Sequence, residues 1–250
     1  MRADGPDRVW HITGRVNWQV WHLKSEWAYD VLTRALERAR EQFAVNILSE
    51  VVMSNHYHFV AQSPPERLYR QLTSRRTPCG HNRPHARNHN KSTVIGQFMR
   101  TWKLAVARSV QKDLDIKGRF WEGPHHRRRI VDAWALVTAV AYDHRNPVRA
   151  GMVAAPEAYD RSSARWWSGG TAGRVRLCTR PDFPFLDIEV FRASLLRFQR
   201  EKRLDDVMEA FSKSRWPFDS PRGRALIEKL MREAGIDPLA PSARVPKSRA

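Results

Sequence analysis

Two segments of strand-like composition, separated by a two-residue turn signal, most constrain how this chain can fold. Residues 47–53 (ILSEVVM) and 56–62 (HYHFVAQ) are rich in β-branched, aromatic and other apolar residues. Ser54 and Asn55 lie between them and have the composition of a tight turn. The sequence therefore predicts a β-hairpin.

The second strand of the hairpin places two histidines on one face. Side chains alternate along a strand, so His56 and His58 point to one side of the sheet. Tyr57 and Phe59 point to the other side and would anchor the strand onto helices. Two imidazoles on one face can hold a single divalent cation. The alternative, common for an isolated His-X-His pattern, is that both histidines only face solvent.

The other elements follow from hydrophobic periodicity and from helix caps. In chain order we expect a strand at 8–16, a helix capped by Ser25, the hairpin, a short helix after Pro65, a long helix from Ser92, strand signals within 119–131, and a helix at 133–145 that Asp132 caps and Pro147 stops. An antiparallel sheet with helices packed on one face accommodates this order. The predicted class is α+β, ferredoxin-like or RNA-recognition-motif-like (RRM-like).

Two stretches lie outside this core pattern. Residues 74–91 carry many charges and show no periodicity, which predicts a loop insertion. Apolar residues return at helical spacing towards the C-terminus, which predicts a helical C-terminal extension over 181–250. The sequence thus divides into a principal domain at 1–180 and this extension.

The charge balance points to a polyanionic partner. Lysine and arginine number 44 against 26 acidic residues, so the formal net charge is +18, an excess that folding does not require. We find no apolar run of about 18 residues that would span a membrane, and no signal-peptide core at the N-terminus. The basic residues are spread along the chain, which favours nucleic acid over a membrane surface. The two cysteines, Cys79 and Cys178, form no CxxC pair, which fits a reducing cytoplasm.

A second group of candidate residues lies at the end of the last core helix. Tyr142 and Asn146 are four residues apart and therefore share a helix face. A carboxamide there can supply a third metal ligand beside the histidines, and a phenol can reach the same site. The alternative is that Tyr142 packs in the core and that Asn146, which precedes Pro147, caps the helix.

Several arginines are candidates for DNA contacts. Arg127, Arg128 and Arg129 follow two histidines in one run, a pattern that is equally compatible with a solvated edge. Arg145 and Arg149 flank the tyrosine motif and can hold a DNA strand beside it. Arg149 can instead cap the C-terminus of the helix.

These motifs resemble those of the HUH single-tyrosine transposases, and most of all the REP-associated tyrosine transposases. Residues 51–59 (VVMSNHYHF) are similar to the family signature VMPNHxH, and residues 142–153 (YDHRNPVRAGMV) are similar to its signature YIxxNPVRAGLV. With further similarities in the first strand, in the GRFWEG run and after the tyrosine motif, the resemblance covers roughly residues 8–165. Residues 1–180 would then be the HUH tyrosine transposase catalytic domain.

The resemblance implies a role for each candidate residue. His56, His58 and Asn146 would bind Mg²⁺ or Mn²⁺. Tyr142 would attack the scissile phosphate of single-stranded or hairpin DNA and form a 5′-phosphotyrosine. A phenol is a weak nucleophile at pH 7 and needs nearby positive charge or a base. The metal, His144 and the arginine run are the candidates for this activation.

The sequence departs from the family at Ser54, which replaces a proline, and at Asp143, which replaces an apolar residue and adds a negative charge near the site. Neither change removes a ligand or the nucleophile. Two other functions stay open: a domesticated, non-catalytic nucleic-acid-binding protein, and a nickase of the relaxase or replication-initiator type. The intact histidines and tyrosine argue against the first, and the NPVRAG signature argues against the second. The sequence is compatible with both a monomer and a homodimer.

Overall fold

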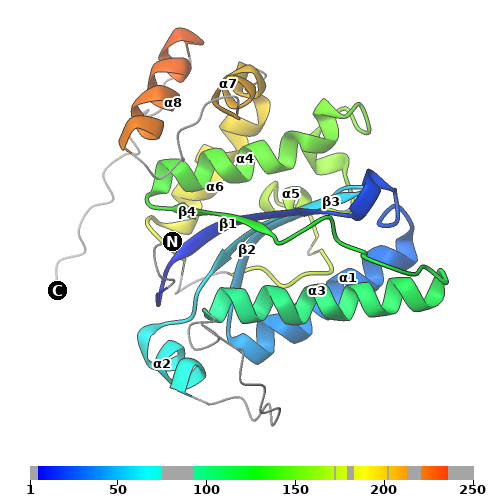
Figure 1. Ribbon diagram of the computed structural model, residues 1–250. Coiled ribbons are helices and arrows are strands. Elements are labelled where there is room, and N and C mark those ends of the chain that lie inside the picture. Colours follow the sequence, from blue (N-terminus) through cyan, green and yellow to red (C-terminus); the bar gives the residue numbers. More distant parts are fainter. Residues whose placement is uncertain are drawn as a thin grey trace.

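A four-stranded antiparallel sheet forms the centre of the molecule (Figure 1). The computed structural model describes residues 5–74, 93–171, 173–178, 183–201, 203–212 and 221–235. The strands are β1 (Val9–Arg15), β2 (Asn46–Val52), β3 (His56–Gln62) and β4 (His126–Ile130), in the spatial order β2-β3-β1-β4. The predicted α+β class with an antiparallel sheet is confirmed, and β2 and β3 form the predicted hairpin.

Two long helices cover one face of the sheet. They are α1 (Glu26–Phe43) and α3 (Val94–Asp113), which lie side by side below the sheet in Figure 1. The hydroxyl of Ser25 caps α1 as predicted, by accepting a hydrogen bond from the Ala28 amide. The cap of α3 is Thr93, one residue later than the predicted start.

Aromatic rings fill the core between this face and the two helices. Tyr57 and Phe59 of β3 meet Trp102 of α3 edge-to-face, with ring centroids 4.6 and 4.9 Å away. The Tyr57 ring lies so close to Gly14 of β1 that a β-carbon at that position would overlap the phenol. The prediction that Tyr57 and Phe59 point away from the two histidines is confirmed.

Helix α4 (Ala133–Arg149) covers the opposite face of the sheet, which corrects the prediction that the helices pack on one face only. Its N-terminus is capped by Asp132, as expected. Every residue from Ala135 to Ala141 is buried. A helix that is apolar on all sides needs cover on all sides, so α4 lies between the sheet and a further layer of helices.

That further layer comes from the predicted C-terminal extension. It contains α6 (Ile188–Arg200), α7 (Arg203–Ser212) and α8 (Pro221–Glu233). In Figure 1, α6 crosses behind α4, and α7 and α8 lie above it. Phe191 and Leu195 of α6 are fully buried and belong to the same apolar cluster as α4. The helical nature of this region matches the prediction. The domain boundary at residue 180 stays a prediction, because these helices share their core with the domain before them.

The end of α4 lies beyond Pro147, where the sequence predicted a stop at residue 145. A proline inside a helix removes the hydrogen bond to the carbonyl four residues earlier, and here this loss falls in the last turn. The Ala150 amide donates to the Asn146 carbonyl over 2.9 Å. Gly151 follows with a φ of 66°, the left-handed conformation that commonly ends a helix. Asn146 is therefore inside the helix, one turn after Tyr142.

The remaining elements are short. They are η1 (Asn17–Gln19), α2 (Glu66–Ser74), η3 (Pro156–Ala158) and α5 (Ala164–Trp167). Of the strand signals at 119–131, only β4 forms a strand, and Trp121 pairs with Val16 through a single bridge. The predicted loop insertion at 74–91 falls outside the described residues from position 75 onwards. Within the described part of the chain, no helix has the length and apolar character needed to cross a bilayer.

Candidate active site

The residues that the sequence predicts as metal ligands and nucleophile line one cleft. His56 and His58 reach it from β3, and Tyr142, Asn146 and Arg149 reach it from α4. The cleft has a volume of about 850 Å³. The rings of His56 and His58 meet edge-to-face with centroids 5.2 Å apart. The side-chain nitrogen of Asn146 lies 3.5 Å from Nε2 of His58.

A local contact fixes the state of His56. Its Nδ1 lies 2.7 Å from Oδ1 of Asn55, the preceding residue in the hairpin turn. Because an amide oxygen can only accept, Nδ1 carries the proton and Nε2 keeps its lone pair. Burial, helped by the neighbouring His58 and Arg15, lowers the pKa of His56 to about 3. His56 is therefore a neutral imidazole at pH 7, the form that binds metal ions.

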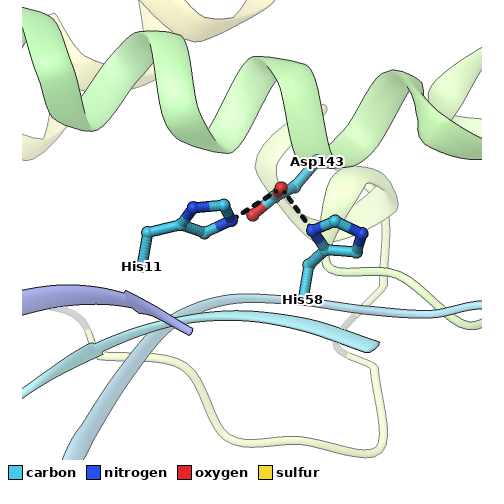
Figure 2. Close-up of side chains that lie close together, drawn as sticks. All are labelled: His11, His58 and Asp143. Carbon is cyan, nitrogen blue, oxygen red and sulfur yellow. Dashed lines mark hydrogen bonds and ion pairs between the residues drawn. The ribbon is translucent and has the colours of Figure 1, made fainter. Parts of the chain in front are cut away.

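The buried carboxylate of Asp143 orients the ring of His58, as the Asn55 side chain orients the ring of His56. Oδ1 of Asp143 lies 2.9 Å from Nδ1 of His58 and 3.0 Å from Nε2 of His11 (Figure 2). Burial alone would raise the pKa of Asp143, but His11 and His58 together hold it well below its usual range. Asp143 is thus ionised, and its contact with Nδ1 leaves Nε2 of His58 on the side of Asn146. Oriented imidazoles of this kind are typical of metal sites.

Sequence reasoning missed the role of Asp143 and His11. The sequence marks Asp143 only as an added negative charge, and His11 lies without a role of its own in the strand predicted at 8–16. The rings of His11 and His58 stack with centroids 5.8 Å apart, because the antiparallel register places β1 beside β3. The alternation of side chains along β1, combined with that register, is the signal that would have placed His11 on the face of the histidine pair.

Two sets of atoms can hold a cation at this place. One set is Nε2 of His56, Nε2 of His58 and the carboxamide of Asn146, which line the cleft. The other set contains Nε2 of His11, Nδ1 of His58 and a carboxylate oxygen of Asp143. His58 belongs to both sets, through different ring nitrogens. Of the two sets, only the first consists entirely of residues that line the cleft.

Tyr142 is the tyrosine whose phenol is available in the cleft. Its ring is half-buried and lies 5.1 Å from the guanidinium carbon of Arg149. Tyr57 contributes to the wall of the cleft but its side chain is fully buried on the opposite face of the sheet. The hydroxyls of Tyr29 and Tyr159 are buried and donate to Glu50 Oε1 and to the Val52 carbonyl.

The arginines of β4 point to both faces of the sheet. Arg128 is paired with His11 in the strand register, so its side chain is on the face of α4 and the cleft. Arg127 is on the other face, where its guanidinium lies 4.9 Å from the Trp10 ring and donates to Thr93 Oγ1. By alternation Arg129 shares that other face.

The structure contradicts the prediction that Arg145 holds a DNA strand beside the tyrosine motif, because this side chain does not line the cleft. The side chain is buried and points to the C-terminal helices. It donates to both carboxylate oxygens of Asp205 and, over 2.7 Å, to the backbone carbonyl of Gln199. It is next to the cleft residue Asn146 in sequence, but neighbouring side chains on a helix point in different directions.

His144 is likewise excluded as an activator of the phenol. It is fully buried, and its ring nitrogens contact Ser163 and Gln199 side chains. Burial lowers its pKa to about 3. The two histidines that precede the arginine run, His125 and His126, line the cleft instead. Burial lowers the pKa of His125 to about 4, with Lys103 and Arg127 acting in the same direction.

A comparison with solved structures finds this fold in a transposase. The structure of a REP-associated tyrosine transposase bound to a REP hairpin matches with a TM-score of 0.50 and 17% sequence identity, covering 74% of this chain and 93% of that one. The chain has the fold of a REP-associated tyrosine transposase. A putative transposase from Deinococcus radiodurans R1 also matches, with a TM-score of 0.34, 15% identity, and coverage of 61% of this chain and 90% of that one. At the level of sequence, no family model and no curated protein matches the chain.

Proposed function

We propose that the chain is a metal-dependent endonuclease and strand transferase for single-stranded DNA, a transposase that acts through a 5′-phosphotyrosine. The observation that carries the proposal is the convergence of β3 and α4 on one cleft. The strand supplies His56 and His58, and the helix supplies Tyr142 and Asn146. The transposase fold supports this assignment, as does the net charge of +18, which suits a nucleic-acid partner.

The donor set in the cleft fits a hard divalent cation. His56 and His58 have their Nδ1 atoms engaged by oxygen atoms, which leaves both Nε2 atoms for a metal. A carboxamide oxygen from Asn146 would complete the protein ligands. When bound, Mg²⁺ or Mn²⁺ would polarise a phosphoryl oxygen and offset charge on the leaving oxygen. We favour this set over the His11–His58–Asp143 cluster because a cation must be reachable by DNA to act on it.

Tyr142 would carry the covalent step. Its phenolic oxygen forms a bond to the scissile phosphorus while the bond to the 3′ oxygen breaks, and the proton lost by the phenol is balanced by the one that the leaving 3′ oxygen gains. The product is a 5′-phosphotyrosine and a free 3′-OH. The new linkage is again a phosphodiester, so attack by another 3′-OH rejoins strands without ATP.

Two arginines would hold the DNA strand at the cleft. The guanidinium of Arg149 lies over the Tyr142 ring and is exposed, so it can both favour the phenolate and contact a phosphate. Arg128 is exposed on the same face of the sheet. Arg127 and Arg129 are on the opposite face, and Arg145 is internal, so we do not assign them to the cleft.

The test is the formation of a covalent adduct. Wild-type protein is incubated with a labelled single-stranded oligonucleotide that contains a hairpin, in Mn²⁺, and separated on a denaturing gel. Tyr142→Phe removes one oxygen and should abolish the adduct while DNA binding persists. Tyr159→Phe is the matched control and should keep the adduct, because that phenol is buried away from the cleft. Mass spectrometry should place the nucleotide on the peptide that contains Tyr142.

Two outcomes would change the assignment. An adduct that survives in Tyr142→Phe would move the nucleophile to another residue. The absence of any adduct over a range of metals and hairpins, with DNA binding intact, would favour a non-catalytic DNA-binding protein on the same fold.

A further inference from the structure

The segment that joins β1 to α1 is hydrogen-bonded to the hairpin turn that precedes His56, and it exposes two tryptophans. Trp18 is 85% exposed and Trp21 is 63% exposed. Among the described residues of this chain, most other tryptophans are buried or half-buried. Leaving two large aromatic rings in water forgoes the stabilisation that their burial would provide. Their exposure is therefore explained most simply by a partner that covers them.

This segment is not a loose loop, because its backbone is tied to the hairpin that carries the histidines. The Val16 amide donates to the Asn55 carbonyl over 2.8 Å, and the Leu23 amide donates to the Ser54 carbonyl over 3.0 Å. Leu23 is fully buried. The two tryptophans thus lie between two anchors on the same turn, and the Asn55 side chain in that turn orients His56.

The backbone of Trp18 supports a functional reason for its exposure. Its φ of 58° lies in the left-handed region, which is unfavourable for a bulky side chain and persists only where the surroundings impose it. A third anchor lies directly before it, where the Asn17 amide donates to the Phe120 carbonyl over 2.8 Å. The chain therefore holds Trp18 in a strained conformation with its indole in solvent.

The charges around the two rings suit a phosphate backbone. The ammonium of Lys24 lies 5.1 Å from the centre of the Trp21 ring. Arg15 is exposed at the end of β1 and lines the cleft. No acidic residue occurs between Gly14 and Ser25. Aromatic faces interleaved with cations are the combination that binds unpaired nucleotides, whose bases stack while their phosphates meet the cations.

We propose that Trp18 and Trp21 form a stacking site for unpaired bases of the DNA strand that enters the cleft. This inference rests on the proposed function, because it takes single-stranded DNA as the ligand. The bases stack on the indoles, and Lys24 and Arg15 contact the phosphates between the stacking site and the cleft. The site positions the strand relative to the histidine pair without reading base edges, so it tolerates different sequences.

The test measures binding rather than cleavage. Fluorescence anisotropy in EDTA gives the affinity for a hairpin with an unpaired flank, for the same hairpin without the flank, and for versions with a single abasic site at each flank position. The protein is compared with a Trp18→Ala/Trp21→Ala double variant. We expect the double variant to lose about tenfold or more in affinity for the flanked hairpin and to bind the flankless hairpin as wild type does.

The abasic series identifies stacking as the cause. At one or two positions, an abasic site should weaken binding by the wild-type protein and have no further effect on the double variant. Trp18→Phe/Trp21→Phe should restore most of the affinity, because phenylalanine also stacks. Val20→Ala is the matched control within the same segment, and it should change nothing, since Val20 is exposed but not aromatic.

Three results would overturn the inference. The first is an unchanged affinity in the double variant, and the second is an equal loss on flanked and flankless hairpins. The third is that the double variant loses binding to anionic vesicles but binds DNA as the wild type does. Thermal unfolding of each variant checks that the fold is retained. The inference fails independently of the proposed function: a wild-type adduct without tryptophan dependence excludes the stacking site only, and base-dependent binding without an adduct excludes the transposase chemistry only.

Discussion

At the scale of single residues, the candidate site depends on one buried carboxylate. Oδ1 of Asp143 contacts His11 and His58 at the same time, and its side chain is almost completely buried. A buried charge is costly unless it is paired, so a carboxylate at this place serves its two partners. For His58, that partner fixes which ring nitrogen faces the cleft.

We expect Asp143→Asn to weaken metal binding by about 10- to 100-fold, because a carboxamide is neutral and orients the imidazole less strongly. Isothermal titration with Mn²⁺ measures the effect, and metal-free DNA binding should stay at the wild-type level. Asp160→Asn is the matched control, because that carboxylate is exposed and pairs with the exposed Arg165. Wild-type Mn²⁺ affinity in Asp143→Asn would show that the carboxylate does not support the ligand.

At the scale of elements, α4 has three different functions on three sides. One side packs on the sheet, one packs on the C-terminal helices, and the side with Tyr142, Asn146 and Arg149 lines the cleft. Arg145 belongs to the second side, where it pairs with Asp205 of α7. Two arginines four residues apart in one motif therefore have unrelated roles.

We expect Arg145→Met and Arg149→Met to affect different properties. Arg145→Met leaves the partly buried Asp205 carboxylate without its cation and should lower the free energy of unfolding by about 3 kcal/mol. Arg149→Met should change stability by less than about 0.5 kcal/mol and should weaken DNA binding and its salt dependence. Chemical denaturation and anisotropy on the same two variants measure both. The reverse pattern would contradict the placement of the two side chains.

The sequence predicted most elements because their signals are local. The hairpin follows from Ser54 and Asn55, the caps of α1 and α4 from Ser25 and Asp132, and the histidine face from simple alternation. Packing between elements that are far apart in the sequence was harder to predict. The continuous apolar run of α4 predicts a core helix, but it does not by itself show that this helix covers a second face of the sheet.

The candidate site shows the same limit. The sequence brought His56, His58, Tyr142 and Asn146 together through their motifs, and the structure places all of them at one cleft. It did not pair Asp143 with His11, because 132 residues separate them and no local pattern links them. It also assigned Arg145 by its position in a motif, whereas the direction of a side chain on a helix depends on what packs around that helix.

At the scale of the whole molecule, the charge of +18 determines how DNA would be held. Every cation that meets a phosphate releases a condensed counterion, so affinity falls as salt rises. Four exposed or solvent-facing cations are proposed near the strand: Arg15, Lys24, Arg128 and Arg149.

We expect the logarithm of the affinity for single-stranded DNA to fall with the logarithm of salt concentration with a slope of about −3, for four phosphate contacts on a single strand. Anisotropy titrations across a salt series measure the slope. Removing Arg149 should make the slope shallower by about 0.7, which is the contribution of one phosphate contact. A slope near zero would exclude phosphate contacts as the source of affinity, whatever the chemistry at the cleft.

Strand β3 belongs to two environments at once, with His56 and His58 on one side of a single layer of backbone and Tyr57 and Phe59 on the other. Gly14 lies against Tyr57, so one added methyl group there would push the phenol and, with it, the strand that carries both histidines. A substitution at Gly14, which supplies no predicted metal ligand, can therefore displace the two histidines. The geometry of the candidate site, as well as folding, therefore limits which substitutions the α1–α3 core accepts.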